Sequence, residues 1–295
     1  MLVSRKRLVL FLFAIFALAV FVGCGSSDDD SSSENSGTDS GSTVAASDCT
    51  PANLSTFKDG VLTIGTDSPA YPPYFEDDDP TNGKGFESAL GYAIAGELGF
   101  NDSQVEWATV PFNASYAPGP KDFDFDLNQI SITPAREKAV TFSEPYYTAN
   151  QAVLVKKGSD LDGITSLDQL KDASIGVQIG TTSYDAVVEQ IDPSSDPKTF
   201  DNSNDVVTAF KQDQVDAIVV DLPTAIYLRD AELSDTVVAG QFEQEGGDQW
   251  GALMAKDSDL KGCVDQAINT LKEDGTLEEI TNQWMADSAK APLLN

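Results

Sequence analysis

The feature that most constrains the fold is the alternation of short apolar runs with segments of helical periodicity. Phe86, Leu90, Ile94 and Leu98 recur every four residues and predict an amphipathic helix that ends at Gly99. Further helices are expected after Ser166 and Gly180, around residues 206–210 and 260–271, and after Gly275. Short strands are expected at residues 61–64, 129–132, 153–155, 174–177 and 217–220. Strands and helices in this order are typical of an α/β fold with largely parallel sheets.

Two of the predicted helices begin with a capping box, in which a polar residue is followed three positions later by Glu or Gln. The pairs are Ser166 with Gln169 and Thr276 with Glu279. Both are therefore predicted to mark helix N-termini.

The chain is strongly acidic, with 48 Asp and Glu residues against 18 Lys and Arg residues and a net charge of −30. Such a chain repels nucleic acid and anionic membrane surfaces, so neither is expected as a partner. The simplest interpretation of the charge is a solvated surface that keeps an exported protein soluble. The sequence has no histidine, which excludes Ser-His-Asp and Cys-His catalysis and histidine-containing zinc sites. No metal or cofactor is expected.

Residues 1–23 have the pattern of a bacterial lipoprotein signal peptide. A basic head at residues 5–7 precedes an apolar run over residues 8–22, which is short for a membrane span and suits a signal sequence. Cys24 stands where such a signal has its lipidated cysteine, although Phe21 replaces the usual Leu. We therefore expect a lipid anchor at Cys24, on the outer face of the cytoplasmic membrane or in the periplasm. The alternative is a plain secretory signal with an incidental cysteine.

Residues 24–48 consist mostly of Ser, Asp, Gly and Thr, which predicts a disordered linker between the anchor and the folded part. No second apolar stretch approaches a spanning length, so membrane contact is expected through the lipid alone. Cys49 and Cys263 remain, one at each end of the folded region. An exported pair in an oxidising compartment favours a disulfide, and the alternative is two buried free thiols.

Polar residues lie at the ends of the predicted strands, where ligands collect in open α/β sheets. They are Asp67, Ser131 with Arg136 just beyond it, the turn at residues 180–182, and Asp221. Arg136 offers a planar fork for a carboxylate, and the turn offers backbone N–H groups at a helix N-terminus. Asp221 offers an anion for an ammonium group. This set of groups suits an α-amino acid or another small polar ligand.

Each of these groups also has a simpler interpretation. A single Arg such as Arg136 is more often part of a surface ion pair, and the turn at residues 180–182 is more often an ordinary helix cap. Tyr71, Tyr74 and Phe112 would, by the same reasoning, be packing residues. Their arrangement on successive strand ends is what favours a binding site.

Six segments stand in the order typical of one protein family. They are GTD at 65–67 with YPPYF at 71–75, GF at 85–86, QISITPAR at 129–136, FSEPYY at 142–147, GTT at 180–182, and VDA at 215–217 leading to Asp221. On these segments, and over nearly all of residues 54–286, the chain resembles the extracellular solute-binding proteins of polar amino-acid ABC importers.

The resemblance implies a two-lobed α/β fold of the periplasmic-binding-protein type, with a ligand cleft between the lobes. The chain would cross between the lobes twice, near residues 149–152 and 239–243. Residues 49–149 and 242–295 would form the first lobe, and residues 150–241 the second.

By motif position, Arg136 would bind the ligand carboxylate together with Ser131, and Asp221 would receive the α-ammonium. Aromatic residues would enclose the aliphatic part of the ligand. The implied ligand contacts are Asp67, Tyr71, Phe112, Asn128, Gln129, Ser131, Arg136, Thr181, Thr182 and Asp221. Many family members have small residues where Asn128 and Gln129 stand, so the departure concerns specificity. One Arg against Asp67 and Asp221 leaves an excess negative charge, which favours a polar or cationic ligand.

The implied function is the capture of an amino acid and its delivery to an ABC transporter permease, by a monomer that is not an enzyme. The main alternative is a dehydratase on the same fold, with Asp67 as a desolvated acid. A sensory domain would normally be fused to a transmembrane helix or signalling module, of which no sign follows the last predicted helix. A structural surface protein would not explain the polar groups at the strand ends.

Overall fold

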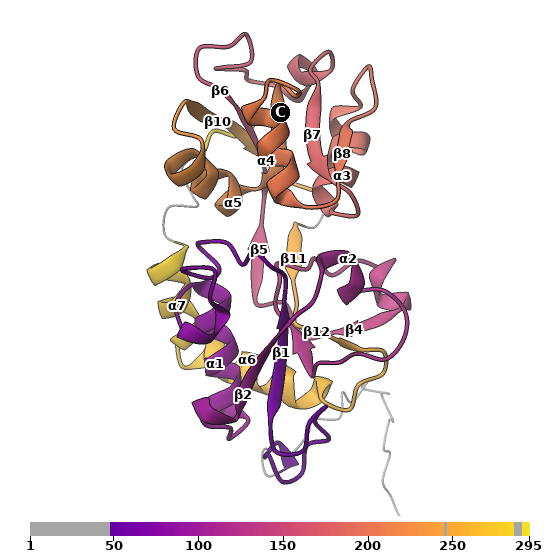
Figure 1. The fold of residues 1–295 in the computed structure, drawn as a ribbon, viewed down its shortest axis with the longest axis vertical. Helices are drawn as coiled ribbons and strands as arrows, with labels where there is room; N and C mark the ends of the chain where they lie inside the picture. Colours follow the sequence, from indigo (N-terminus) through magenta and orange to yellow (C-terminus); the bar gives the residue numbers. More distant parts are fainter. Residues whose placement is uncertain (1–47, 245–246, 286–290) are drawn as a thin grey trace, which may run out of the picture. The chain divides into compact units, whose positions relative to one another are not determined.

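A computed structural model describes residues 48–244, 247–285 and 291–295. The predicted signal peptide, Cys24 and all of the predicted linker except Asp48 lie outside these residues. None of the described helices combines the length and apolarity of a transmembrane span. The described chain forms two lobes, each built on a five-stranded sheet (Figure 1).

The sheet of the first lobe has the strand order β2-β1-β3-β12-β4. Its strands are β1 (Leu62–Thr66), β2 (Val105–Thr109), β3 (Phe125–Asp126), β4 (Val140–Phe142) and β12 (Leu253–Ala255). β1 pairs in parallel with β2 and β3, whereas β12 pairs antiparallel with β3 and β4. Every residue of β1 is buried, as is typical of a strand covered on both faces.

Three helices of the first lobe pack against one another beside this sheet (Figure 1). They are α1 (Phe86–Glu97), α6 (Lys261–Glu273) and α7 (Thr276–Trp284), and a fourth, short helix is α2 (Phe112–Ser115). Phe86, Leu90 and Ile94 on α1 are fully buried in one core with Ile64 of β1. The four-residue apolar spacing therefore predicted the buried face of α1 correctly.

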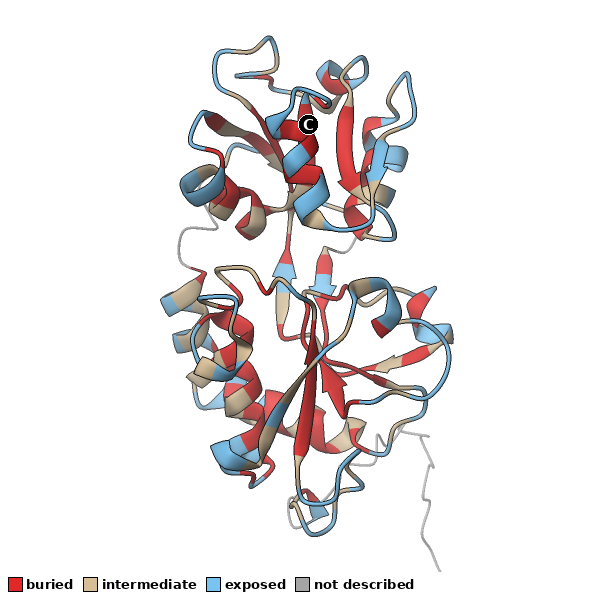
Figure 2. Ribbon diagram, in the orientation of Figure 1, coloured by how far each residue is buried: buried red, intermediate tan, exposed pale blue. Residues whose placement is uncertain are grey.

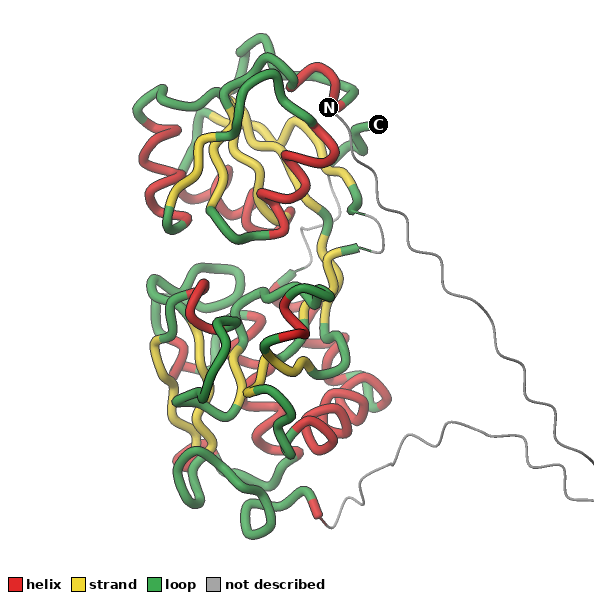
Figure 3. The backbone as a smooth tube through the Cα atoms, turned by 90° about the vertical axis from the view of Figure 1, so that its right-hand side faces the viewer, coloured by secondary structure: helices red, strands yellow, loops and turns green. Residues whose placement is uncertain are grey.

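The sheet of the second lobe has the order β10-β6-β9-β7-β8. Its strands are β6 (Gln151–Lys156), β7 (Ile175–Gln178), β8 (Lys198–Phe200), β9 (Ala217–Asp221) and β10 (Thr236–Phe242). Its helices are α3 (Thr182–Ala186), α4 (Ser203–Lys211) and α5 (Leu222–Tyr227). In the rotated view of Figure 3, these helices flank the strands. Figure 2 shows the strands largely buried and the outer sides of the helices exposed.

Single-turn helices complete the two lobes. The 3-10 helices are η2 (Pro80–Asn82), η3 (Asp102–Gln104), η4 (Arg136–Lys138) and η5 (Leu167–Leu170), and the π-helices η6 (Val187–Ile191) and η7 (Leu228–Glu232) continue α3 and α5. η4 matters for function because Arg136 is its first residue.

Both sheets are mixed, which corrects the expectation of largely parallel sheets. β7 pairs in parallel with β8 and β9, but β6 pairs antiparallel with β9 and β10. β6 and β12 are the strands that the chain enters when it arrives from the other lobe. They start at the cleft, where the parallel strands of each lobe end, and so they run in the opposite direction.

A pair of antiparallel strands connects the lobes, β5 (Tyr147–Ala149) and β11 (Asp248–Trp250) (Figure 1). β5 leads almost directly into β6, and β10 is followed by β11. The two connections between the lobes therefore run side by side. They lie near the two crossings, at residues 149–152 and 239–243, that the family resemblance implies.

The C-terminal residues 291–295 lie on the second lobe. The Leu294 N–H donates to the Gln241 carbonyl over 2.8 Å, and the Gln241 N–H donates to the Pro292 carbonyl over 2.8 Å. Leu294 is 5% exposed and belongs to the same core as β6 and β7. A Cβ atom at Gly240 would lie 2.5 Å from Leu294 Cγ, so glycine leaves the space that Leu294 fills. The expected boundary at residue 242 places these residues in the first lobe, whereas their contacts are with the second.

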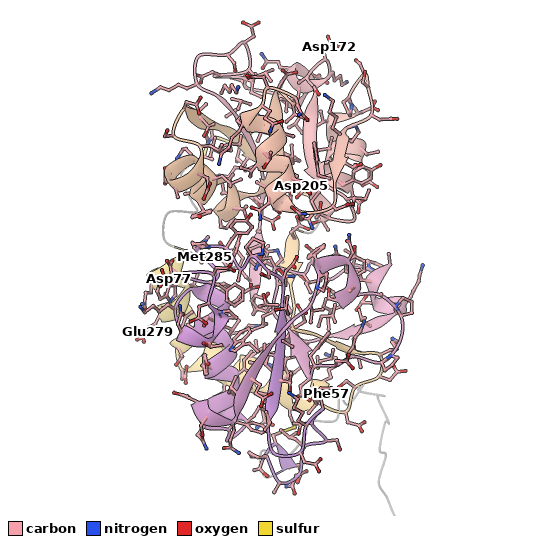
Figure 4. All side chains as sticks on the ribbon, in the orientation of Figure 1. Phe57, Asp77, Asp172, Asp205, Glu279 and Met285 are labelled. Atoms are coloured by element: carbon pink, nitrogen blue, oxygen red, sulfur yellow. A yellow bond between two sulfur atoms is a disulfide. The ribbon has the colours of Figure 1, made fainter. Side chains whose placement is uncertain are left out.

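Cys49 and Cys263 form a disulfide that links the start of the described chain to α6, as the sequence predicted. Acidic side chains are spread over the surface of both lobes, and Figure 4 labels Asp77, Asp172, Asp205 and Glu279 among the exposed ones.

Two local predictions are wrong. Residues 129–132 do not form a strand, because Gln129 has a positive φ of 49° and only Ser131 makes an isolated bridge, to Trp250. The capping box at Thr276 is also absent, since Gly275 is the N-cap of α7 and makes no side-chain cap. The other capping box, Ser166 with Gln169, is confirmed at η5.

Candidate ligand-binding site

A cavity of about 100 Å³ lies where the ends of β1 and β3 in the first lobe approach the ends of β7 and β9 in the second. All of the predicted ligand contacts except Arg136 line this cavity: Asp67, Tyr71, Phe112, Asn128, Gln129, Ser131, Thr181, Thr182 and Asp221. The cavity therefore joins the strand-end residues Asp67, Ser131, Thr181, Thr182 and Asp221 with residues that only the family resemblance implied.

Asp67 follows β1 directly and is held by backbone donors. Its carboxylate accepts the N–H of Ser68 over 2.7 Å and the N–H of Phe112 over 3.3 Å. Burial raises the pKa of Asp67, and the two backbone hydrogen bonds partly oppose this change. The carboxylate is thus fixed at the edge of the cavity, where it can accept a hydrogen bond from a ligand.

Asn128 and Gln129 have different surroundings, although both line the cavity. The Asn128 side chain is buried, and its Nδ2 has no hydrogen-bond partner among the described residues. Gln129 instead directs both its backbone N–H (2.8 Å) and its side-chain amide to the carboxylate of Glu87 on α1. Only Asn128 therefore keeps an amide free for a ligand.

Glu87 is a buried acid in contact with the cavity residue Gln129, and sequence reasoning did not identify it. It is fully buried and also accepts the hydroxyl of Tyr146 over 2.5 Å. Burial raises the pKa of Glu87 to about 7, and its three hydrogen bonds oppose the rise. A Glu on the buried stripe of an amphipathic helix is the sequence signal that could have pointed to it.

Arg136 lies behind the cavity wall rather than on it. Its guanidinium, 8% exposed as a residue, donates to the Ser131 carbonyl over 2.8 Å and to the Gly180 carbonyl over 3.0 Å. The Cζ atom lies 4.8 Å from the centre of the Tyr116 ring and 5.5 Å from that of Phe112. Burial lowers the pKa of Arg136, but nearby acids oppose this, so the group stays cationic.

The turn before α3 reaches towards Arg136 from the second lobe. Thr181 is the N-cap of α3 and accepts the Tyr184 N–H on its hydroxyl, while Thr182 is the first helical residue. Gly180 has a φ of +78°, and a Cβ there would lie 2.5 Å from the Tyr116 hydroxyl. Glycine is thus required both for the left-handed turn and for the close approach of the first lobe.

Asp221 closes the opposite side of the cavity, at the end of β9. Its carboxylate accepts the side-chain amide of Gln151 over 2.6 Å. Burial and the charge of the neighbouring Asp248 carboxylate together raise the pKa of Asp221 to about 8. The anion expected for an ammonium group is therefore in place, but it prefers to be protonated while no cation is near.

Hydrogen bonds across the cleft join the lobes around this cavity. The Ser131 and Thr182 hydroxyls are 3.2 Å apart, and the Tyr74 and Thr224 hydroxyls are 2.9 Å apart. The Tyr71 hydroxyl also contacts the Asn204 side chain. Residues from both lobes are therefore needed to make the site.

Some lining residues were missed by sequence reasoning, namely Gln178, Asn202, Asn204 and Thr224. Asn202 follows β8 and caps α4, so the strand-end rule applies to it as well. β8 was not predicted because two of its three residues are exposed and it has no apolar run.

Known proteins of one family are similar to this chain. The family model of bacterial extracellular solute-binding proteins, family 3, matches residues 62–287. The arginine-binding extracellular protein ArtP of Bacillus subtilis (strain 168) is 30% identical, over 95% of this chain and 98% of its own length.

Two solved structures share the fold. One is an ancestral arginine-binding protein bound to glutamine, with a TM-score of 0.66 and 32% identity over 78% of this chain and all of the other. The second is an ancestral amino acid-binding protein described as a precursor of cyclohexadienyl dehydratase, with a TM-score of 0.62 and 31% identity over 76% of this chain and 94% of the other. The chain therefore belongs to family 3 of the bacterial extracellular solute-binding proteins.

Proposed function

We propose that this protein captures a polar or cationic amino acid in the cleft and delivers it to the permease of an ABC transporter. The observation that carries the proposal is the pairing of opposite charges across one cavity. Asp221 lines it from the second lobe, and Arg136 lies behind its wall in the first. An α-amino acid would offer its ammonium group to Asp221 and its carboxylate to Arg136.

The carboxylate end of the ligand would lie near Ser131, Thr182 and the guanidinium of Arg136. Arg136 donates to two backbone carbonyls, but its guanidinium has five N–H donors, so a ligand carboxylate need not displace either contact. The hydroxyls of Ser131 and Thr182, now 3.2 Å apart, would turn their hydrogens to the same carboxylate.

The side chain of the ligand would extend towards Asp67 and Asn128. Asp67 offers an acceptor and the free Asn128 amide offers a donor, which is the chemistry of a polar side chain. The excess of acidic groups over Arg136 favours a cation such as arginine, which ArtP is named for binding.

A thermal-shift screen against the twenty amino acids tests the proposal. A ligand present at 100 times its dissociation constant adds about 2.7 kcal/mol of stability. We expect such a shift with at least one polar or cationic amino acid. If none of the twenty shifts the midpoint, the proposal is wrong.

The enzyme alternative rests on the likeness to a precursor of a dehydratase. Asp67 is the carboxyl group that would act as the acid; burial raises its pKa, and two backbone N–H groups partly oppose this by stabilising its ionised form. We propose binding without turnover. Incubation of the protein with each ligand from the screen, followed by chromatography, would detect any product.

We also propose that the protein is exported and is anchored by a lipid on Cys24. The basic head, the apolar run and the position of Cys24 support the anchor. Cys24→Ser should move the protein from the membrane fraction to the soluble extracytoplasmic fraction. A variant that stays on the membrane after a salt wash would contradict the lipid anchor.

A further inference from the structure

The fully buried side chain of Gln151 joins two carboxylates. Its Nε2 donates to Asp221 over 2.6 Å and to Asp248 over 2.5 Å, while its Oε1 has no partner among the described residues. Asp221 lines the cavity, and Asp248 is the first residue of β11, one of the two strands that connect the lobes. The amide therefore links the proposed ammonium site to the connection between the lobes.

No ion pair within the described residues neutralises either carboxylate. Arg136 is the nearest cation that acts on Asp221, and its guanidinium hydrogen bonds are made to backbone carbonyls. The Asp221 and Asp248 carboxylates share one neutral donor and repel each other, which favours a proton on Asp221. Burial and the Asp248 charge together raise the pKa of Asp221 to about 8.

We propose that Asp221, Gln151 and Asp248 form one ammonium-binding unit, which releases a proton when it binds the ligand. This inference rests on the proposed function. While no cation is near, Asp221 holds a proton. When the α-ammonium arrives at Asp221, that proton leaves to the solvent and the cation balances the charge of Asp221, beside which Gln151 holds Asp248 as a second negative charge. Asp248, which does not line the cavity, is thereby assigned a role as a positioning residue for ligand binding.

Other charged and titratable groups face the unit. Arg136 and Glu87 act on Asp221, which in turn acts on Tyr74, and Asp248 acts on Arg136 and Asp185. Glu87 has its own donors in Gln129 and Tyr146 and does not line the cavity. Asp221 and Asp248 differ from these groups because both accept a hydrogen bond from the Gln151 side-chain amide.

Affinity should therefore rise with pH. Below pH 8 the ligand has to displace a proton, so the dissociation constant should fall by up to about tenfold per pH unit between pH 5.5 and 7.5. Above pH 8 the dependence should flatten, because Asp221 is then ionised before the ligand binds.

Calorimetry at pH 6.5 in phosphate and in Tris tests the exchange. The two buffers have different ionisation enthalpies, so the difference in observed binding enthalpy counts the protons released. The probe is L-arginine or, if L-arginine gives no shift in the screen, the amino acid that gives the largest one. We expect about one proton released per ligand by the native protein.

Asp248→Asn keeps the shape of the side chain and removes the second charge. We expect proton release to fall by at least about half and the pH profile of affinity to flatten, with binding retained through Asp221. Asp172→Asn, at an exposed site that does not line the cavity, removes the same charge and should leave the proton count unchanged.

The outcomes separate this inference from the proposed function. Native protein that binds the amino acid without releasing a proton overturns the inference alone, and so does an Asp248→Asn variant with the native proton count. If Asp248→Asn does not fold, the native proton count and pH profile decide. If no amino acid binds at all, the proposed function and this inference are both wrong.

Discussion

At the scale of single residues, Arg136 shows how a cation can be kept in place before a ligand arrives. Its guanidinium lies beside two aromatic rings and donates to a carbonyl of each lobe. The planar fork matters here, because it lets one cation donate to Ser131 and to Gly180 at the same time. The group is therefore oriented by the protein's own contacts.

Arg136→Lys should weaken binding of the amino acid at least tenfold, or about 1.4 kcal/mol, because the charge remains but the fork is lost. Calorimetry with the amino acid found in the screen measures the change. Arg229→Lys is the matched control, since Arg229 pairs with its neighbour Asp230 at the surface. Near-native affinity in Arg136→Lys would show that the carboxylate is held by other groups.

Glu87 should make stability depend on pH. Its folded pKa of about 7 lies above the ordinary value of 4.5, so between these values the folded protein holds a proton that the unfolded chain has lost. The free energy of unfolding should therefore fall as the pH rises through this window, by up to about 3 kcal/mol from this group.

Glu87→Gln should remove that share of the pH dependence, since a glutamine cannot ionise. Urea denaturation at pH 5 and pH 7.5 measures it, with Glu279→Gln on the exposed side of α7 as the control. An unchanged pH dependence in Glu87→Gln would contradict the assignment.

The residues of the site were predictable where chemistry is visible in the sequence. Asp67, Asp221 and the turn at residues 180–182 follow apolar runs, and all of them lie at the cavity. Glu87, Gln151 and Asp248 were not predictable, because their roles come from burial and from contacts with residues far along the chain. No local pattern records such contacts.

At the scale of elements, the most informative segment is the C-terminal one. Residues 291–295 pair with β10 and place Leu294 in the core of the second lobe, after α7 has packed on the first. The chain thus makes a third passage between the lobes, which the family resemblance did not predict. A short segment without apolar periodicity does not indicate which sheet edge it pairs with.

Leu294→Ala should lower the free energy of unfolding by about 2 to 4 kcal/mol, since it opens a cavity beside Gly240. Leu293→Ala is the matched control, because Leu293 is 58% exposed and should change stability by less than about 0.5 kcal/mol. Urea denaturation compares the two. Equal effects of both substitutions would mean that the segment does not pack as described.

Strands and helices with strong periodicity were predicted well, as α1, β7 and β9 show. The failures have physical causes. Residues 129–132 are apolar enough for a strand, but the positive φ of Gln129 turns the chain to the cleft. The direction of β6 and β12 could not be predicted either. It depends on the side from which the chain enters each lobe, which the sequence does not show.

At the scale of the whole molecule, the disulfide closes a loop that contains the entire second sheet. Cys49 and Cys263 are 214 positions apart, and both ends of the loop lie in the first lobe. In the chain-entropy model a loop of this length restricts the unfolded chain more than a short one does.

Replacing both cysteines by serine should therefore lower the free energy of unfolding by roughly 4 to 5 kcal/mol. Guanidinium denaturation of the variant measures this, and native protein treated with a reductant should give the same value. A loss below about 1 kcal/mol in both would contradict the expectation.

The repeated passage between the lobes has a consequence for synthesis and export. The first lobe lacks β12, α6 and α7 until residue 284 has been made, and the second lacks Leu294 for ten residues more. A domain made of consecutive residues can fold while the ribosome is still adding the next one. Neither lobe of this chain has that option, because the first is completed only by α7 and the second only by Leu294. The proposed export would benefit, since a chain whose lobes are completed late stays unfolded for longer while it is synthesised.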